Sequence, residues 1–498
     1  MRSVLVPPRA SAMLEALRGM GYSTETALAD IIDNSIAAGA DRVALAFNWD
    51  GPHSSISVVD NGVGMSQPEL AAAMRLGHLS PLDARRPSDL GRFGLGLKTA
   101  SLSQARRLTV ASRRRAGPLS AYRWDLDVIA QSADDGWHLL EVPADDAAAL
   151  AAPLADAPSG TAVVWEAMDR VVGDGRREQP FLDVIDGVER HLAMTYHRYL
   201  EGAPSRLQIS INGRKVAPWD PYLDRHPASW SSPVERLATD GGTIEVQCHV
   251  LPHKDRMGGA EYAAAAGPEG WAAHQGFYVY RNERLILPGS WLGLGIRRAW
   301  IKDEAHRLAR IRLDLPNTAD VEWRIDIRKA TAHPPLAVRS RLAHLAEDTR
   351  RRARNVFAHR AGDGPSGNLE LPLWRTEHSG SRVRYFVDRG HPLVAAALQG
   401  GGPQSQAVEA LLRVVEQTLP VRRIWLDAAE EEERAGAGWG HGTPEDARAL
   451  LRDVYGTLTT VGGLSPRAAV QLLGRMEPFD TYPQLVAELL GDEAGAMH

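Results

Sequence analysis

Cysteine and long apolar runs are scarce in this sequence. Cys248 is the single cysteine among 498 residues. One thiol excludes an internal disulfide bond and a zinc site built from cysteines. No apolar run has the length of a membrane-spanning helix, and residues 1–12 are short and proline-bearing, unlike a signal peptide. We therefore expect a cytoplasmic protein with no membrane partner.

An excess of positive charge is also absent. The formal net charge is −5, so the chain as a whole has no nucleic-acid signature, and contact with DNA would need a local basic face. A triplet of arginines on a turn is usually only solvated. The densest positive clusters, which keep DNA as a candidate partner, are Arg113, Arg114 and Arg115, and Arg350, Arg351, Arg352 and Arg354.

Length and composition predict a globular protein of several domains. A chain of 498 residues is too long for one hydrophobic core, and its 44% hydrophobic and 24% charged residues are ordinary values. We expect an α/β fold, an α+β sandwich with helices on one face of a sheet, over residues 1–172. A second domain is expected at 173–360 and a third, α/β or helical and of unknown role, at 361–498. Strands are predicted at 42–47, 55–59, 108–112, 120–126, 137–142 and 161–165.

Residues 29–35, Ala-Asp-Ile-Ile-Asp-Asn-Ser, have the spacing of a magnesium-nucleotide site on a helix. Residues four apart share a helix face, so Asp30 and Asn34 point the same way. The amide oxygen of Asn34 suits Mg²⁺, which keeps few protein ligands. Asp30, one turn earlier, can accept a proton from a water aimed at the γ-phosphate.

Two glycine-containing stretches extend this pattern. In the first, residues 58–65, Asp60 follows an apolar strand and could accept the amine of adenine, while Gly62 and Gly64 let the backbone pass close to the ring, with Met65 beside them. In the second, residues 91–98, successive glycine N–H groups lead into a helix and form an anion cradle for phosphates. Its residues are Gly91, Gly94, Gly96 and Lys98, the last adding a positive charge.

In order and spacing these stretches resemble the GHKL ATPases: gyrase, Hsp90, histidine kinase and MutL. Residues 29–40 look like the first motif of that family, 60–64 like the second, 91–98 like the lid and its glycine motif, and 159–164 like the fourth. The lead Gly-Tyr-Ser-Thr-Glu-Thr-Ala-Leu-Ala-Asp and the loop Arg-Leu-Gly-His-Leu-Ser look most like the bacterial MORC-like branch. The resemblance implies a Bergerat-type ATP-binding domain, in which Thr161 helps to hold the adenine-side carboxylate and its water.

The resemblance also assigns the second domain. Hairpins predicted near residues 207–216, with an Asn-Gly turn, and 276–287 look like the ribosomal S5-like transducer domain of gyrase, MutL and MORC proteins. In that domain the family reaches a lysine or arginine back to the γ-phosphate. Alternating apolar residues predict a strand at 321–329 that delivers Lys329, with Arg328 as the runner-up. Residues 66–90 have the makeup of a mobile lid.

One residue departs from the family pattern. Asp30 stands where the family usually has Glu, and its side chain is one methylene shorter, so we expect slow hydrolysis or none. Asp33 is the alternative base, although in the family the residue before the Asn usually has a structural role or a role on the adenine side of the site.

The sequence therefore predicts an ATPase of the MORC-like branch, using ATP and Mg²⁺ and closing as an ATP-dependent homodimeric clamp. The resemblance implies a role with DNA or with other proteins of a DNA-modification or phage-defence system. A histidine kinase would need a phosphoacceptor helix before Asp30, and we expect too few residues there for one. An Hsp90-like chaperone and a nucleotide-gated interaction module with little or no turnover remain as alternatives.

Overall fold

The structure is a computed structural model in which the chain forms two compact units, Met1–Arg360 and Ala361–His498. No helix among the described residues has the length and apolar character needed to cross a membrane. The described residues are 3, 8–19, 21–78, 96–150, 152–154, 157–173, 177–202, 204–295, 298–325, 332–358, 373–379, 382–399, 402–421, 444–476, 479 and 484–488.

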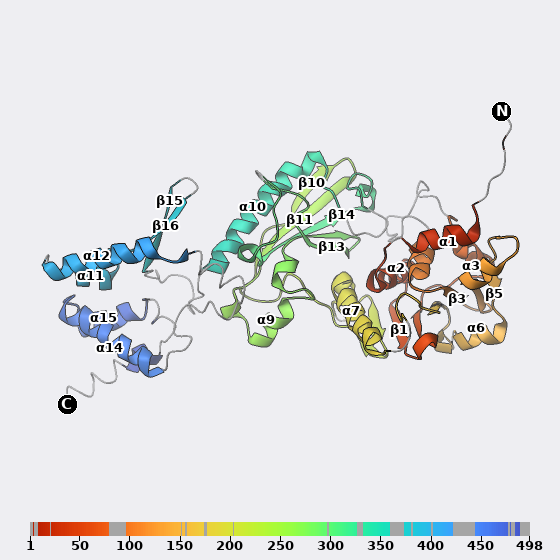
Figure 1. The fold of residues 1–498 in the computed structure, drawn as a ribbon, viewed down its shortest axis with the longest axis horizontal. Coiled ribbons are helices and arrows are strands. Elements are labelled where there is room, and N and C mark those ends of the chain that lie inside the picture. Colours follow the sequence, from red (N-terminus) through yellow and green to blue (C-terminus); the bar gives the residue numbers. More distant parts are fainter. Residues whose placement is uncertain are drawn as a thin grey trace. The chain divides into compact units, whose positions relative to one another are not determined.

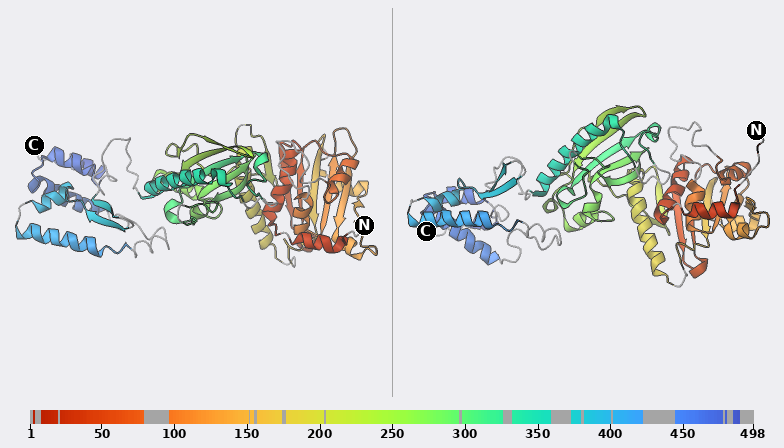
Figure 2. Two further views of the ribbon diagram at one scale, coloured as in Figure 1. Left: turned by 90° about the horizontal axis from the view of Figure 1, so that it is seen from above. Right: turned by 45° about the horizontal axis from the view of Figure 1, so that its top comes forward.

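The N-terminal half of the first unit, Met1–Arg360, contains a sheet (Figures 1 and 2). The sheet has eight strands in the order β5-β4-β3-β6-β2-β1-β7-β8. All neighbours are antiparallel except β1 and β7, which are parallel. The strands are β1 (Arg42–Asn48), β2 (Ser55–Asp60), β3 (Arg107–Arg113), β4 (Ser120–Asp125), β5 (Leu140–Glu141), β6 (Gly160–Glu166), β7 (Gln208–Ile211) and β8 (Arg214–Lys215).

Alternation in the sequence explains how β1 sits in this sheet. Val43, Leu45 and Phe47 of β1 are buried while the residues between them are exposed, as expected for a strand covered on one face. The predicted strands appear where expected, although 137–142 contributes only the two residues of β5. The sheet also extends past the expected boundary at 172/173, because β7 pairs with β1.

Most of the helices cover one face of the sheet and share its core, whereas Ala147 and Leu154, in two short helical elements, pack against Val59 and Ala162 on the other face. The central one, α2 (Thr24–Ala37), begins at Ser23, whose side chain accepts from the N–H of Thr26 in a capping box. It packs against α4 (Gly96–Gln104) and α7 (Gln179–Thr195). The remaining helices are α1 (Ala10–Arg18), α3 (Gln67–Met74), α5 (Leu126–Gln131), α6 (Ala144–Leu150) and α8 (His197–Leu200), with 3₁₀ turns η1 (Gly51–His53) and η2 (Ala152–Leu154).

Part of the expected lid is a packed element. Residues 67–74 form α3, which starts at a second capping box between Ser66 and Glu69. Leu70 and Met74 are buried in the main core, so hydrophobic burial holds this segment in place. Residues 79–90 of the expected lid lie outside the described residues.

A second sheet makes up the other half of unit one, in the order β10-β11-β14-β12-β13, with β9 paired to β11. Helix α10 (Leu336–Ala358) lies along it, burying Val338, Leu342 and Ala346 at four-residue intervals (Figure 1). The strands are β9 (Trp230–Ser231), β10 (Glu235–Thr239), β11 (Gly242–Val250), β12 (Gly276–Arg281), β13 (Arg284–Ser290) and β14 (Ala309–Leu315). Shorter elements are α9 (Gly259–Ala265), η3 (Lys254–Arg256), η4 (Trp271–His274), η5 (Glu304–His306) and η6 (Asn317–Ala319).

The strand predicted at 321–329 is wrong over its described part. Residues 321–324 form a turn, in which the N–H of Trp323 donates to the carbonyl of Ala319. Trp323 and Ile325 are both buried in the core of the second sheet. The alternation of apolar residues therefore reflects side chains that a turn inserts into a core.

The second unit is small and contains both strands and helices. A hairpin of β15 (Trp374–Ser379) and β16 (Arg382–Val387) precedes α11 (Pro392–Leu398) and α12 (Pro403–Thr418). After residues outside the description, α14 (Pro444–Thr460) and α15 (Pro466–Leu473) enclose a separate core that includes Leu458.

Candidate active site

Asp30 lies on α2 facing the first residue of α4. Its side chain is 6% exposed, and the phenol of Tyr22 donates a hydrogen bond of 3.0 Å to its Oδ2. A Cβ added to Gly96 would lie 3.5 Å from the same Oδ2. The structure therefore brings Asp30 to the helix start where the sequence predicts phosphates. Tyr22 was not predicted as a site residue, because a lone tyrosine before a helix carries no signal of its own.

Asn34 is exposed one turn after Asp30, and its Nδ2 donates to the carbonyl of Asp30 at 2.9 Å. With the amide nitrogen bonded to the helix, Oδ1 is the end that can meet a cation. A neutral oxygen on an exposed helix face fits Mg²⁺, which takes one or two protein ligands together with water and phosphate oxygens.

Asp33, one turn after Asp30, is engaged by other protein side chains. It is 1% exposed, and its carboxylate accepts from the hydroxyl of Tyr196 at 2.7 Å and from Nε of Arg284 at 3.0 Å. The same Tyr196 hydroxyl lies 2.6 Å from the carbonyl of Ala29. Burial and the neighbouring Asp33 raise the pKa of Tyr196, so it stays a protonated donor. Asp33 is thus occupied by protein groups, which argues against its use as the base.

Asp60 ends β2 in a buried position beside α2. Its Oδ2 accepts from the hydroxyl of Ser35 at 2.8 Å and its Oδ1 from the N–H of Gly62 at 2.9 Å. Burial raises the pKa of Asp60 even though these hydrogen bonds act to lower it. Carboxylate oxygens carry several lone-pair sites, so Asp60 can still accept an adenine amine.

The glycines beside Asp60 are required by backbone packing. Gly64 has φ +65°, and a Cβ there would lie 2.0 Å from the carbonyl oxygen of Arg113 on β3. At Gly62 a Cβ would lie 2.9 Å from Ala38. Close approach of two chain segments therefore explains both glycines, whether or not adenine lies above them.

Thr161 pairs with Asp60 across β2 and β6. Its hydroxyl lies 2.9 Å from the hydroxyl of Ser112 on β3, which in turn accepts from the N–H of Met65 at 2.9 Å. The structure thus gathers the second and fourth motifs through Ser112. No sequence pattern indicated this serine, because its contacts depend on the register of β3 against β6.

Lys98 points from α4 to the end of α3. Its ammonium donates to the carbonyl of Ala73 at 2.8 Å, and burial lowers its pKa to about 8. Lys98 therefore links the two helices at this end of the site. Gly91 and Gly94 lie outside the described residues, as do Lys329 and Arg328.

The two arginine clusters differ in how far their side chains are exposed and could contact DNA. Arg114 is exposed 3.2 Å from Glu69, and Arg115 is exposed, whereas Arg113 donates to the carbonyl of Leu154. On α10, Arg350 is buried, with its guanidinium 4.6 Å from the ring centre of Trp291. Arg350 is thus part of the core and not of a basic surface.

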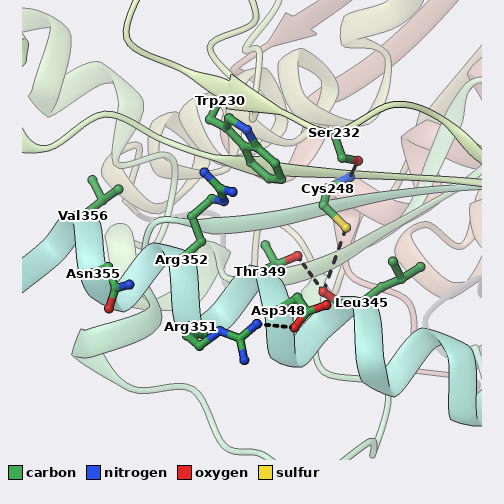
Figure 3. Close-up of a pocket in the computed structure, with 10 residues that line it drawn as sticks. All are labelled: Trp230, Ser232, Cys248, Leu345, Asp348, Thr349, Arg351, Arg352, Asn355 and Val356. Carbon is green, nitrogen blue, oxygen red and sulfur yellow. Dashed lines mark hydrogen bonds and ion pairs between the residues drawn. The ribbon is translucent and has the colours of Figure 1, made fainter. Parts of the chain in front are cut away.

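A cavity of about 750 Å³ lies between α10 and the strands β9 and β11 (Figure 3). Arg352 lies over the ring of Trp230, 4.0 Å from its centre, and Arg351 pairs with Asp348 at 2.6 Å. Two of the predicted DNA-contacting arginines therefore line a mixed-charge hollow that also contains Cys248.

A group with metal-ligand chemistry lies away from α2. Among the described residues, His197, Glu201 and Asp220 bring one ligand atom each within 4.8 Å of one another. His197 Nδ1 lies 2.8 Å from Glu201 and Nε2 lies 2.8 Å from the hydroxyl of Tyr280. These hydrogen bonds satisfy the buried histidine without a metal.

Comparison with known families gives one match. Residues 22–161 match the family described as Histidine kinase-, DNA gyrase B-, and HSP90-like ATPase. A search of curated proteins found no match. The matched segment begins at Tyr22 and ends at Thr161, and it includes Asp30, Asn34 and Asp60. It combines antiparallel strands with covering helices and is followed by further α/β structure. Residues 22–161 of this chain belong to the GHKL ATPases.

Proposed function

We propose that the protein binds ATP with Mg²⁺ and hydrolyses it slowly, using Asp30 as the base. The observation that carries the proposal is the position of Asp30 on α2, 3.5 Å from where a Cβ of Gly96 would lie, with Asn34 one turn away. A carboxylate then lies beside a helix start, with the proposed magnesium ligand one turn along α2, within a segment that matches an ATPase family.

Each residue has a part in the proposed reaction. Asp60 accepts the adenine amine, and the N-terminal end of α4 receives the phosphates. Asn34 Oδ1 would hold Mg²⁺, which neutralises charge on the phosphate oxygens. Asp30 takes the proton of the attacking water as the water oxygen bonds to the γ-phosphorus, the bond from that phosphorus to the β,γ-bridging oxygen breaks, and ADP leaves. Tyr22 fixes the carboxylate through Oδ2.

Slow turnover follows from the length and contacts of Asp30. The side chain is one methylene shorter than Glu, while Oδ2 accepts from Tyr22 and Oδ1 lies 3.9 Å from the guanidinium of Arg284. A carboxylate that is held by a donor on one side and lies near a cation on the other has less freedom to reach the attacking water. These contacts also favour the alternative of a nucleotide-gated interaction module with little or no turnover.

We further propose a cytoplasmic MORC-like clamp, whose homodimer closes on ATP, in a DNA-modification or phage-defence system. The motif resemblance supports this interpretation. Closure of the lid and contact of Lys329 with the γ-phosphate would favour the dimer in ATP and not in ADP, which offers no such group. An Hsp90-like chaperone is the rival interpretation.

Mass photometry with ADP, ATP and a nonhydrolysable analogue, alongside a phosphate-release assay, tests both proposals. We expect dimers with ATP and the analogue, monomers with ADP, and slow phosphate release that Asp30→Asn abolishes. Lys329→Ala should bind ATP but close poorly. Equal dimer fractions in ADP and ATP would contradict the clamp, and ATP binding without phosphate release would leave the interaction module.

A further inference from the structure

The turn between β12 and β13 places two arginines opposite each other. Arg281 and Arg284 are paired across the hairpin, and the residues between them have φ values of +46° at Asn282 and +66° at Glu283. Two successive positive φ values are typical of a type I′ turn, which holds the flanking residues in fixed register. The directions taken by the two arginines are therefore set by the hairpin.

Arg284 reaches out of the second sheet and contacts α2. It is 4% exposed, and its Nε lies 3.0 Å from Asp33 Oδ2 while a terminal nitrogen lies 3.9 Å from Asp30 Oδ1. One guanidinium thus spans two carboxylates that lie one helical turn apart. A planar, always charged group is suited to hold both in fixed positions.

Neighbouring contacts fix the rest of the turn against the first half of the unit. The hydroxyl of Tyr199 donates to the carbonyl of Asn282, and Arg206 pairs with Glu283. Tyr196, from the end of α7, binds Asp33 beside Arg284. The hairpin is therefore attached to α2 and to the α7–α8 corner at the same time.

We infer that Arg284 is a positioning residue that couples the second sheet to the catalytic helix. By holding Asp33 it sets the turn of α2 that carries Asp30 and Asn34, and displacement of the hairpin shifts that turn. Arg284 makes this contact with carboxylates of α2, so it is separate from any contact between Lys329 and phosphate. The inference rests on the proposed ATPase function.

Arg281 provides a matched control on the same hairpin. It is also buried, but it pairs with Asp320, which belongs to the second half of the unit. Arg281→Met and Arg284→Met therefore each remove one buried ion pair made by the same hairpin. The replacement of Arg281 leaves the contact between Arg284 and α2 in place.

The first measurement separates binding from turnover. In Arg284→Met we expect ATP affinity to stay near that of the wild type while kcat falls by about 10²-fold, the size typical of a small misplacement of reacting groups. Arg281→Met should keep kcat. Arg284→Lys restores a positive charge but not the fork geometry, so we expect partial recovery. A normal kcat in Arg284→Met, or equal losses in both Met variants, would overturn the inference.

The second measurement needs no catalysis. Hydrogen exchange of the amides in α2 should speed up in Arg284→Met and not in Arg281→Met, in the absence of nucleotide. If Arg284→Met fails to fold, the double variant Arg284→Met with Asp33→Asn replaces it, since no unpaired charge is then left at Asp33. A wild type that never hydrolyses ATP contradicts the proposed function alone. Unchanged exchange in α2 contradicts the coupling.

Discussion

Tyr22 and Asp30 meet through one hydrogen bond of 3.0 Å between the phenol and Oδ2. The donor comes from just before α2 and the acceptor from within it, so the bond fixes the carboxylate relative to the start of its own helix. In Tyr22→Phe we expect kcat to fall by about tenfold with unchanged ATP affinity, because a hydrogen bond to a charged group is worth about 1.5–3 kcal/mol.

Steady-state kinetics with a direct ATP-binding measurement checks this expectation. Tyr122→Phe is a suitable control, since the Tyr122 hydroxyl accepts from Gln67 on the same half of the unit, at 3.3 Å, and so takes part in a different hydrogen bond. Equal turnover in wild type and Tyr22→Phe would mean that the phenol has no part in orienting the base.

The two acidic residues of α2 should respond differently to amide substitution. Asp30→Asn keeps the size of the side chain but removes the proton acceptor, so turnover should fall by about 10²–10⁴-fold while ATP still binds and the closed dimer lasts longer. Asp33→Asn leaves Arg284 buried opposite a neutral group. Breaking such a pair costs about 3–5 kcal/mol, so we expect a loss of stability first.

Thermal unfolding and phosphate release on both variants distinguish these outcomes. Should Asp30→Asn turn over at the wild-type rate while Asp33→Asn does not, the base is Asp33.

We predict that adenine recognition depends on the ionised form of Asp60. Asp60→Asn can turn a donor toward the adenine amine, and a mispaired buried group costs about 1–3 kcal/mol, so affinity should fall at least about tenfold. Burial raises the pKa of Asp60, so the wild type should lose affinity, as pH falls, at a higher pH than an ordinary aspartate would allow. Calorimetry over an acidic pH series checks both, and unchanged affinity in Asp60→Asn would place adenine elsewhere.

The lowered pKa of Lys98 predicts that ATP binding weakens at alkaline pH. Burial lowers its pKa to about 8, so the ammonium loses its charge above that pH. Phosphates favour the charged form, so ATP affinity should weaken from about pH 7 to about pH 9, with proton uptake on binding at the upper end. For folding the sign is opposite, because burial disfavours the charged amine: this group's contribution to stability rises from about pH 8 toward 10.5.

Buffer-dependent calorimetry measures the proton uptake. In Lys98→Met, ATP affinity should no longer change between about pH 7 and about pH 9. A wild-type affinity that stays constant across them would show that Lys98 does not approach the phosphates.

DNA binding can be tested at arginines that the structure leaves exposed. We expect reversal of Arg115, Arg351 and Arg354 to Glu to abolish a sequence-independent, salt-sensitive affinity for DNA. Arg350→Glu is unsuitable, because Arg350 is buried against Trp291 and its reversal would disrupt the core. Fluorescence anisotropy at several salt concentrations, with ATP present, provides the measurement. If the wild type shows no binding at low salt, the chaperone or the interaction module becomes the favoured interpretation.

Local patterns in the sequence predicted much of the fold and part of the site. Alternation identified β1, and the Asn212-Gly213 pair identified the β7–β8 turn, where both residues have positive φ. Asp30 and Asn34 were placed on one helix by their spacing, and the helix is present. These features depend on residues that are near one another in the chain.

Contacts across long separations escaped prediction. Arg284 and Asp33 are 251 residues apart, and Ser112 meets Thr161 through strand register, so neither contact has a periodic signal. At Trp323 a local pattern pointed to a strand, although the core of the second sheet takes the side chain from a turn. Burial of the Trp323 side chain in this core, and not the local pattern, determines the backbone conformation of the segment.

The parallel pairing of β1 with β7 has a consequence for synthesis of the chain. Residues 42–45 find their hydrogen-bonding partners at 208–211, so β1 is an unpaired edge until the ribosome has released residue 211. Until then the nascent chain carries Asp60 on an incomplete sheet, with the helix of Asp30 packed against it. Fragments that end near residue 172 should therefore aggregate, whereas nascent chains that extend past β8 gain the missing neighbour.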